Sequence, residues 1–194
     1  MHCMSKARLE AFSDGVLAII ITIMVLELKI PQTDDLYELL PLLPIFLSYF
    51  LSFIYVGIYW VSHHYILHLA NQINMKVVWA NINLLFWISM LPFVTAWSGE
   101  NSFAKTPVVL YGIVLLLSSI SFYLLTYTLK ISHDKDSKLV KEIGENKLGK
   151  FSIFFYIIGI FATYYSSYIS LLIYICVAFF WAHPFKKLRI NVSN

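Results

Sequence analysis

The feature that most constrains this chain is the length of its uncharged stretches. Four of them contain no Lys, Arg, Asp or Glu, and they cover residues 39–75, 77–99, 106–129 and 151–185. A helix needs about 20 mostly apolar residues to cross the hydrocarbon core of a bilayer. Only 13% of the residues are charged, against about 25% in a soluble domain, and the mean hydropathy is +0.73. The uncharged stretches therefore predict an all-α integral membrane protein.

Six transmembrane helices are expected in a single domain that covers residues 1–194. We place the spans at about 8–30, 40–69, 77–98, 107–130, 151–165 and 167–183. The last two have about 15 residues each, close to the lower limit of ~17 for a crossing. The polar segment Lys130–Lys150 separates the fourth span from the fifth. We expect this segment to be a linker at the membrane surface that contains a short amphipathic helix.

The basic residues predict the orientation of the spans, because cytoplasmic loops of membrane proteins carry an excess of Lys and Arg. With six spans and a cytoplasmic N-terminus, 12 of the 14 basic residues fall on the cytoplasmic side, and only Lys29 and Lys105 fall outside. Both termini and the linker after the fourth span are then cytoplasmic. The net charge of +3 therefore reflects the topology of the chain in the lipid bilayer, and no nucleic-acid partner is needed to explain it.

The first span carries more polar groups than a membrane anchor requires. Arg8, Glu10, Ser13 and Asp14 lie in its first two turns. Ionisable groups near a bilayer are costly unless they face protein or water, so they indicate a functional site. As one helix over residues 8–30 the span would be about 35 Å long, enough to cross a bilayer.

An apolar stripe runs along the same span. Its members recur at helical spacing and share one face, with a hydroxyl on the flank: Ile19, Ile23, Leu26 and Ile30, with Thr22. Asp14 points about 140° away from Ile19, at about 100° per residue. From the spacing alone, ordinary helix packing is the simpler explanation of this stripe.

Three histidines near the end of the second span raise the question of a metal site. His64 and His68 share a helix face at i, i+4, with His63 beside them. A membrane di-metal enzyme would need many more ligands, and it remains the weakest interpretation. We expect the protein not to be an enzyme and to bind neither a cofactor nor a metal ion. Instead, one histidine is expected to bond a buried polar group such as Asp14, because lipid cannot satisfy such a group.

The first turns of the chain also carry a recognisable motif. Residues 8–14 read Arg-Leu-Glu-Ala-Phe-Ser-Asp, which follows the pattern Arg-x-x-x-Phe-Ser-Asp. The histidines late in the second span accompany it, as do Asn83 and Leu91-Pro92-Phe93 in the third. In these features, its length and its six spans, the chain resembles the endo-lysosomal potassium channel family of small transmembrane proteins, in its prokaryotic single-repeat form.

This resemblance implies a homotetramer in which four copies of the first helix line a central pore for monovalent cations, potassium above all. Ile19 would form the constriction, and Thr22 would contribute to cation preference. Ile23 and Leu26 would form further apolar rings. The motif residues would hold the first helix against the second and third spans through a supporting network: Arg8, Phe12, Ser13 and Asp14, with His63 or His64, Trp79 and Asn83 as partners.

A hydrophobic ring offers no ligands to replace the hydration shell of an ion, and it conducts only while it stays wet. We therefore expect a potassium-permeable, weakly selective cation channel in the plasma membrane of a prokaryote, with apolar rings as a hydrophobic gate. Glu27 would concentrate cations at the outer mouth, or would instead pair with Lys29 or be solvated. The alternative is a secondary transporter or proton-coupled cation exchanger that uses Asp14 and the histidines.

Overall fold

The computed structural model describes residues 5–31 and 34–182, and within these ranges every regular element is helical. The elements are α1 (Lys6–Leu26), the 3-10 helix η1 (Leu36–Leu42), α2 (Leu43–Leu69), α3 (Met75–Ser89), α4 (Leu91–Glu100), α5 (Lys105–Ile131), α6 (Lys138–Ile143), α7 (Lys147–Ala162) and α8 (Ser167–Ala182). The expectation of an all-α fold is therefore confirmed. The expected end of the sixth span and the basic tail after it lie outside the described residues.

Four segments of the described chain are long and apolar enough to cross a membrane: Lys6–Leu26, Leu36–Leu69, Met75–Glu100 and Lys105–Ile131. They correspond to the first four expected spans. The helices α7 and α8 have 16 residues each, which is short for a crossing. Between α5 and α7, the short helix α6 occupies the segment where a surface helix is expected. The count of six spans stays a prediction.

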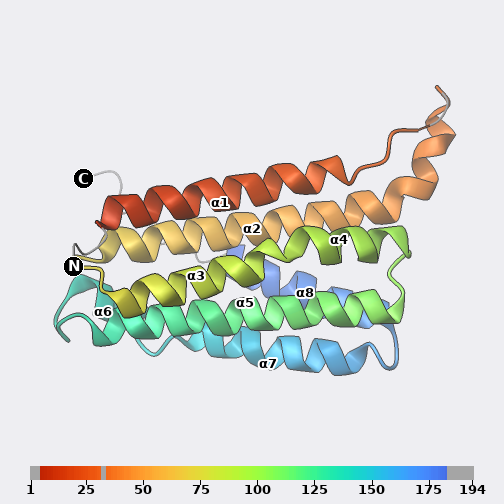
Figure 1. Ribbon diagram of the computed structural model, residues 1–194. Helices are drawn as coiled ribbons and strands as arrows, with labels where there is room; N and C mark the ends of the chain where they lie inside the picture. The colour runs from red at the N-terminus through yellow and green to blue at the C-terminus, as the bar shows by residue number, and fades with distance from the viewer. Residues whose placement is uncertain (1–4, 32–33, 183–194) are drawn as a thin grey trace.

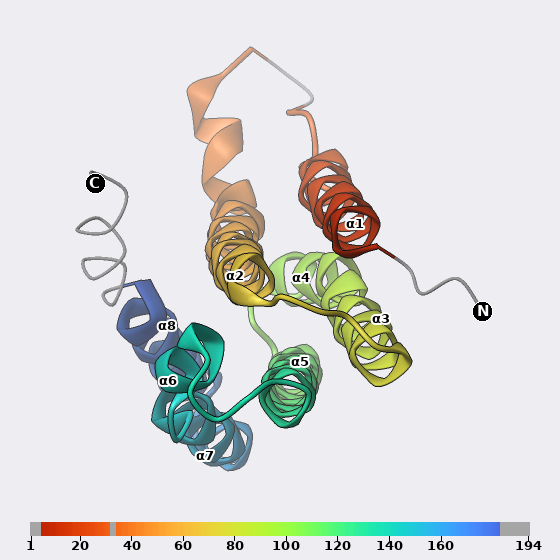
Figure 2. The same ribbon diagram turned by 90° about the vertical axis from the view of Figure 1, so that its left-hand side faces the viewer.

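The long helices lie side by side with their axes roughly aligned (Figure 1). In the view along these axes, α1 lies at one edge of the bundle, and α7 and α8 lie on the other side of α5 from it (Figure 2). The first helix packs on α2, α3 and α4, whereas α5 packs on α3, α4, α7 and α8. Thus α5 has neighbours on several sides, and α1 is peripheral.

The first helix ends at Leu26, earlier than the expected end at residue 30. Glu27 is its C-cap: the Glu27 amide donates to the carbonyl oxygen of Met24, and the Leu28 amide donates to that of Val25. Pro31 explains why the helix cannot reach residue 30, because proline disfavours helical backbone at the residue before it. Ile30 consequently lies beyond the helix and does not continue the apolar stripe.

The third expected span is divided into α3 and α4 at Met90. Pro92 lies in the first turn of α4. Proline has no amide hydrogen, and its ring collides with the carbonyl group four residues earlier, so a helix kinks or stops there. The span that was expected to be one helix over residues 77–98 is therefore two helices joined end to end.

Close packing in the part of the bundle farthest from α1 depends on two glycines. Tyr174 of α8 is fully buried and lies against Gly112 of α5 and Gly159 of α7. A Cβ atom at Gly112 would overlap the Tyr174 hydroxyl, and a Cβ atom at Gly159 would overlap its ring. Small residues allow membrane helices to approach closely in this way. These contacts hold α5, α7 and α8 together as one unit.

Candidate functional site

The first helix has one buried face and one open face. On the buried face the side chains are at most 4% exposed: Leu9, Ser13, Leu17, Ile20 and Met24. On the open face the large apolar side chains are between 42% and 79% exposed: Phe12, Ile19, Ile23 and Leu26. Residues three, four and seven apart share a helix face, so the two sets follow from the sequence spacing. No other part of the described chain covers the open face.

The residues expected to line a pore all lie on this open face. Ile19, Ile23 and Leu26 form a continuous apolar stripe, and Thr22 is exposed beside it. The Thr22 hydroxyl donates to the carbonyl oxygen of Ile19 at 2.9 Å. Because its proton is used within the helix, its oxygen presents free lone pairs outward. The open face therefore combines an apolar stripe with one hydroxyl oxygen that can accept from water or contact a cation.

A buried chain of hydrogen bonds joins α1 to α2 and α3. The Asn81 side-chain amide donates to the Ser13 hydroxyl at 2.9 Å, and Ser13 donates to the carbonyl of Leu9 at 2.8 Å. His63 Nε2 lies 2.6 Å from the Asn81 carbonyl oxygen. Since that oxygen can only accept, Nε2 is the protonated ring nitrogen. The Ser13, His63 and Asn81 side chains are at most 1% exposed.

Asp14 is not part of this series of hydrogen bonds and has a partner of its own. The indole Nε1 of Trp60 donates to an Asp14 carboxylate oxygen at 2.9 Å, which ties α1 to α2 a second time. The rings of Trp60, His64 and His68 follow one another along the exposed side of α2, with centroids 6.2 and 6.3 Å apart. Within the described ranges, no group of three or more His, Cys, Asp and Glu is arranged to hold a metal ion.

Several residues expected in the supporting network lie elsewhere. Asn83 donates to Ser121 of α5 at 2.7 Å, and Trp79 is 63% exposed. Both are two positions from Asn81, about 200° around the helix at about 100° per residue, so they point away from α1. His64 is exposed and stacks along α2 instead of bonding to α1.

The motif itself is also divided between the two faces of α1. Arg8 and Phe12 are exposed, and only Ser13 and Asp14 bond to the neighbouring helices. The expectation that Arg8 and Phe12 hold α1 in place is therefore wrong. Phe12 precedes Ile19 by seven residues, a spacing that puts both on one face. This spacing could have shown from the sequence that Phe12 lies on the open face with Ile19.

The sequence motif did not predict its two partners in the structure, Asn81 and Trp60. Asn81 falls within the buried face of α3, which repeats at helical spacing through Val77, Leu84 and Ile88. A polar residue on an apolar face needs an internal partner in a membrane protein, and this was the signal that could have identified it. Trp60 carries no comparable signal, because aromatic residues are frequent throughout the chain.

At the other end of α1, Glu27 and Lys29 do not pair. Lys29 Nζ lies 2.8 Å from a carboxylate oxygen of Glu100, at the end of α4. Glu27 is exposed and makes no salt bridge with any other residue of the described ranges. The proposed alternative of a Glu27–Lys29 pair is therefore wrong, and the Glu27 carboxylate, at the end of the open face, has no ion-pair partner within the described residues.

Fold and site together define a helical-bundle membrane protein whose N-terminal helix keeps an apolar face uncovered. Residues 8–92 match the family described as "Endosomal/lysosomal potassium channel TMEM175". A protein of Chryseobacterium sp. named a potassium channel is 46% identical over 191 residues, which cover 98% of this chain and 100% of that protein. The chain belongs to the TMEM175 family. The resemblance seen in the Arg-x-x-x-Phe-Ser-Asp motif is thereby confirmed.

Two further comparisons extend along the chain. The human protein named endosomal/lysosomal proton channel TMEM175 is 32% identical over 153 residues, which cover 69% of this chain and 30% of that protein. A crystal structure of a lysosomal potassium-selective channel TMEM175 homolog from Chamaesiphon minutus superposes with a TM-score of 0.80 and 30% sequence identity. It covers 96% of this chain and 98% of that chain.

Proposed function

We propose that this protein is a potassium-permeable, weakly selective cation channel in which the open face of α1 lines the pore. The observation that carries the proposal is the uncovered stripe of Ile19, Ile23 and Leu26, with Thr22 beside it. The relative from Chryseobacterium sp. is named a potassium channel, and the Chamaesiphon minutus protein of similar structure is described as a homolog of a potassium-selective channel. The family relationship supports potassium-channel activity, and the exposed stripe indicates which residues line the proposed pore.

One copy of α1 cannot enclose a pathway, so the channel requires several copies of the chain. We propose a homotetramer with one α1 helix from each copy around the axis. An apolar helix face is about as stable in contact with lipid as in contact with another helix, so the stripe by itself does not require an oligomer. Polar groups at membrane depth are not, and the exposed Thr22 and the half-buried Asp14 favour water or protein as neighbours. The oligomer gives both groups such neighbours.

The proposed selectivity follows from the chemistry of the rings. Ile19, Ile23 and Leu26 provide no oxygen ligands, so ions pass largely hydrated, and dewetting of the narrowest ring closes the pore. The Thr22 oxygens favour the cation whose hydration shell deforms more easily, which is potassium over sodium. Glu27 concentrates cations at the outer mouth, and the pore needs no cofactor besides the permeant ion.

The membrane topology is part of the same proposal. The helices α7 and α8 run along the bundle beside α5 (Figure 1), and α5 is long enough to cross. We propose that α7 and α8 cross as a pair, which gives six spans with both termini and α6 in the cytoplasm. The membrane is then the plasma membrane of a prokaryotic cell.

Ion flux from the purified protein in liposomes tests the pore. Wild-type protein is expected to pass potassium faster than sodium. Ile19→Asn makes the constriction polar, so it is expected to raise the flux several-fold and to reduce the potassium-to-sodium ratio. Ile157→Asn is the matched control, since Ile157 is 40% exposed on α7, away from α1. If Ile19→Asn behaves like Ile157→Asn, the constriction does not lie at Ile19.

The exchanger alternative depends on Asp14 as a proton carrier. Asp14→Asn removes the titratable group but keeps an oxygen that can accept from Trp60. Channel-type potassium flux is expected to persist in this variant, with no requirement for a proton gradient. Saturable flux that depends on a proton gradient in wild type and is abolished by Asp14→Asn would favour the exchanger. Because the human relative is named a proton channel, proton flux is measured in the same liposomes.

A further inference from the structure

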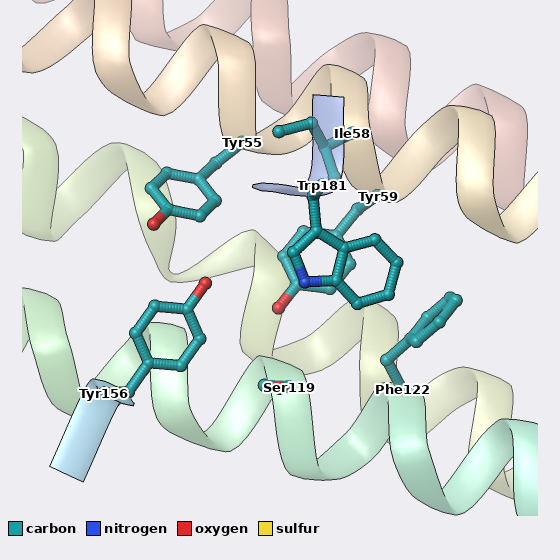
Figure 3. Close-up of a pocket in the computed structure, with 7 residues that line it drawn as sticks. All are labelled: Tyr55, Ile58, Tyr59, Ser119, Phe122, Tyr156 and Trp181. Atoms are coloured by element: carbon teal, nitrogen blue, oxygen red, sulfur yellow. The ribbon is translucent and has the colours of Figure 1, made fainter. Parts of the chain in front are cut away.

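A small cavity, partly open to the surface, lies away from α1, where α2 meets α5, α7 and α8. Figure 3 shows the side chains that line it: Tyr55, Ile58, Tyr59, Ser119, Phe122, Tyr156 and Trp181. The space is about 10 Å³, counted as the room for the centre of a water-sized sphere. About 10–15 Å³ on this measure holds a single water molecule. The cavity therefore has room for about one water molecule.

Two hydroxyl groups on its wall, from largely buried residues, have no hydrogen-bond partner within the described chain. Tyr59 is 7% exposed and Ser119 is 5% exposed, and neither side chain has a hydrogen-bond partner anywhere in residues 5–31 and 34–182. The other polar groups are at least partly engaged: Tyr55 donates to the carbonyl of Tyr174 at 2.6 Å, and Trp181 Nε1 donates to Ser152 at 2.7 Å. The lining thus offers two free hydroxyls to one small space.

A third hydroxyl lies at the same wall. In Figure 3 the hydroxyl groups of Tyr55 and Tyr156 point toward one another. The Tyr55 proton is used on the Tyr174 carbonyl, so its oxygen can only accept there. The Tyr156 oxygen keeps lone pairs that can accept from another donor. Three hydroxyls from α2, α5 and α7 therefore surround the cavity.

We propose that a single structural water molecule binds in this cavity and bridges the hydroxyls of Tyr59, Ser119 and Tyr156. A buried hydroxyl without a partner costs free energy, and lipid cannot supply one. Internal waters typically make about three hydrogen bonds to such groups. The site is specific for a neutral ligand, because no charged side chain lines it and an unpaired cation there would be strongly disfavoured. The water links α2, which packs on α1, to α5 and α7.

Thermal unfolding of purified protein tests the water through a matched control. Ser118 is also buried, and its hydroxyl has no partner in the described chain, but Ser118 does not line the cavity. Removal of an unsatisfied hydroxyl is neutral or stabilising, so Ser118→Ala is expected to leave the midpoint unchanged or raise it. Tyr59→Phe and Ser119→Ala each remove a ligand of the water, and each is expected to lower the midpoint by about 2–4 °C. An unchanged or raised midpoint in either variant overturns the proposal.

Radiolytic labelling in H₂¹⁸O detects the water directly, because hydroxyl radicals generated from a bound water modify the side chains beside it. Tyr59 or Tyr156 is expected to gain ¹⁸O faster than Tyr111. Tyr111 is the control because it is 2% exposed, bonds to Ser52 at 2.9 Å and does not line the cavity. Labelling of both cavity tyrosines at or below the rate of Tyr111 means that no water binds there.

Discussion

The helices α1 and α5 are both long and apolar enough to cross a membrane, but their surroundings differ. In the most apolar stretch of α1, 28% of the residues are buried, against 56% in α5. Other helices of the same chain surround α5 on several sides, and α1 packs on α2, α3 and α4 along one face only. Hydropathy thus determines that a helix enters the membrane, but it does not determine what covers its faces.

The small residues of the two helices show the same contrast. Gly112 of α5 lies against the buried Tyr174, whereas Gly15 of α1 has nothing within 4 Å of the place where a Cβ would be. On α5 a glycine allows close contact within the chain. On α1 the glycine lies on the open face, which no other described part of the chain covers.

Substitution of Gly112 by alanine is expected to lower the stability of the protein more than any of the other proposed substitutions, whereas the same substitution at Gly15 is not expected to lower it. Gly112→Ala forces a methyl group against Tyr174, which is fully buried and also lies against Gly159. We expect a loss of about 3 kcal/mol, at the upper end for overpacking, measured by thermal unfolding in detergent. Gly15→Ala is the matched control, with an expected gain of about 0.5–1 kcal/mol from helix propensity. Equal effects would show that the two helices are covered alike.

An intermediate effect is expected at the hydrogen-bonded chain that holds α1. Asn81→Ala leaves Ser13 without its donor and His63 without its acceptor in a fully buried site, at a cost of about 2 kcal/mol. Asn83→Ala is the control, because it removes one bond, to Ser121, from a half-buried side chain. Thermal unfolding should show a clearly larger loss for Asn81→Ala. A larger loss for Asn83→Ala would contradict the role of Asn81 in holding α1.

The smallest effect is expected where α1 leads into the loop after it. Lys29 and Glu100 form an ion pair at 2.8 Å whose side chains are 59% and 42% exposed. Exposed pairs contribute about 0.2–1 kcal/mol and are screened by salt. Lys29→Ala should therefore lower the unfolding midpoint slightly at low ionic strength and not at high ionic strength. A large loss that is independent of salt would show that Lys29 has another role.

Helical spacing correctly predicted that Ile19, Ile23 and Leu26 share one side of α1. The same spacing places Phe12 on that side too, although the motif suggested that Phe12 supports the helix from its buried side. Within a single helix, spacing fixes which residues lie together. The predicted supporting role of Phe12 came from the motif and not from spacing, which explains the error.

Contacts between helices were harder to predict. Asn83 and Asn81 are two positions apart, and only the rotation of α3 about its axis decides which of them meets Ser13. That rotation depends on the packing of all the neighbouring helices. The early end of α1 and the break at Met90 follow from Pro31 and Pro92, but proline is tolerated in many membrane helices, so its presence alone does not locate a break.

We propose that the open face of α1, and not its buried face, lines the conduction pathway. It is tested by potassium flux in liposomes after Cys3 and Cys176 are replaced by Ser and a single cysteine is introduced at Ile19 or at Ile20. Ile19 is 57% exposed and Ile20 is 4% exposed. We expect a charged thiol reagent to stop or strongly reduce potassium flux through the Ile19→Cys variant and to leave flux through the Ile20→Cys variant unchanged. Full flux through modified Ile19→Cys, or block of Ile20→Cys alone, would contradict it.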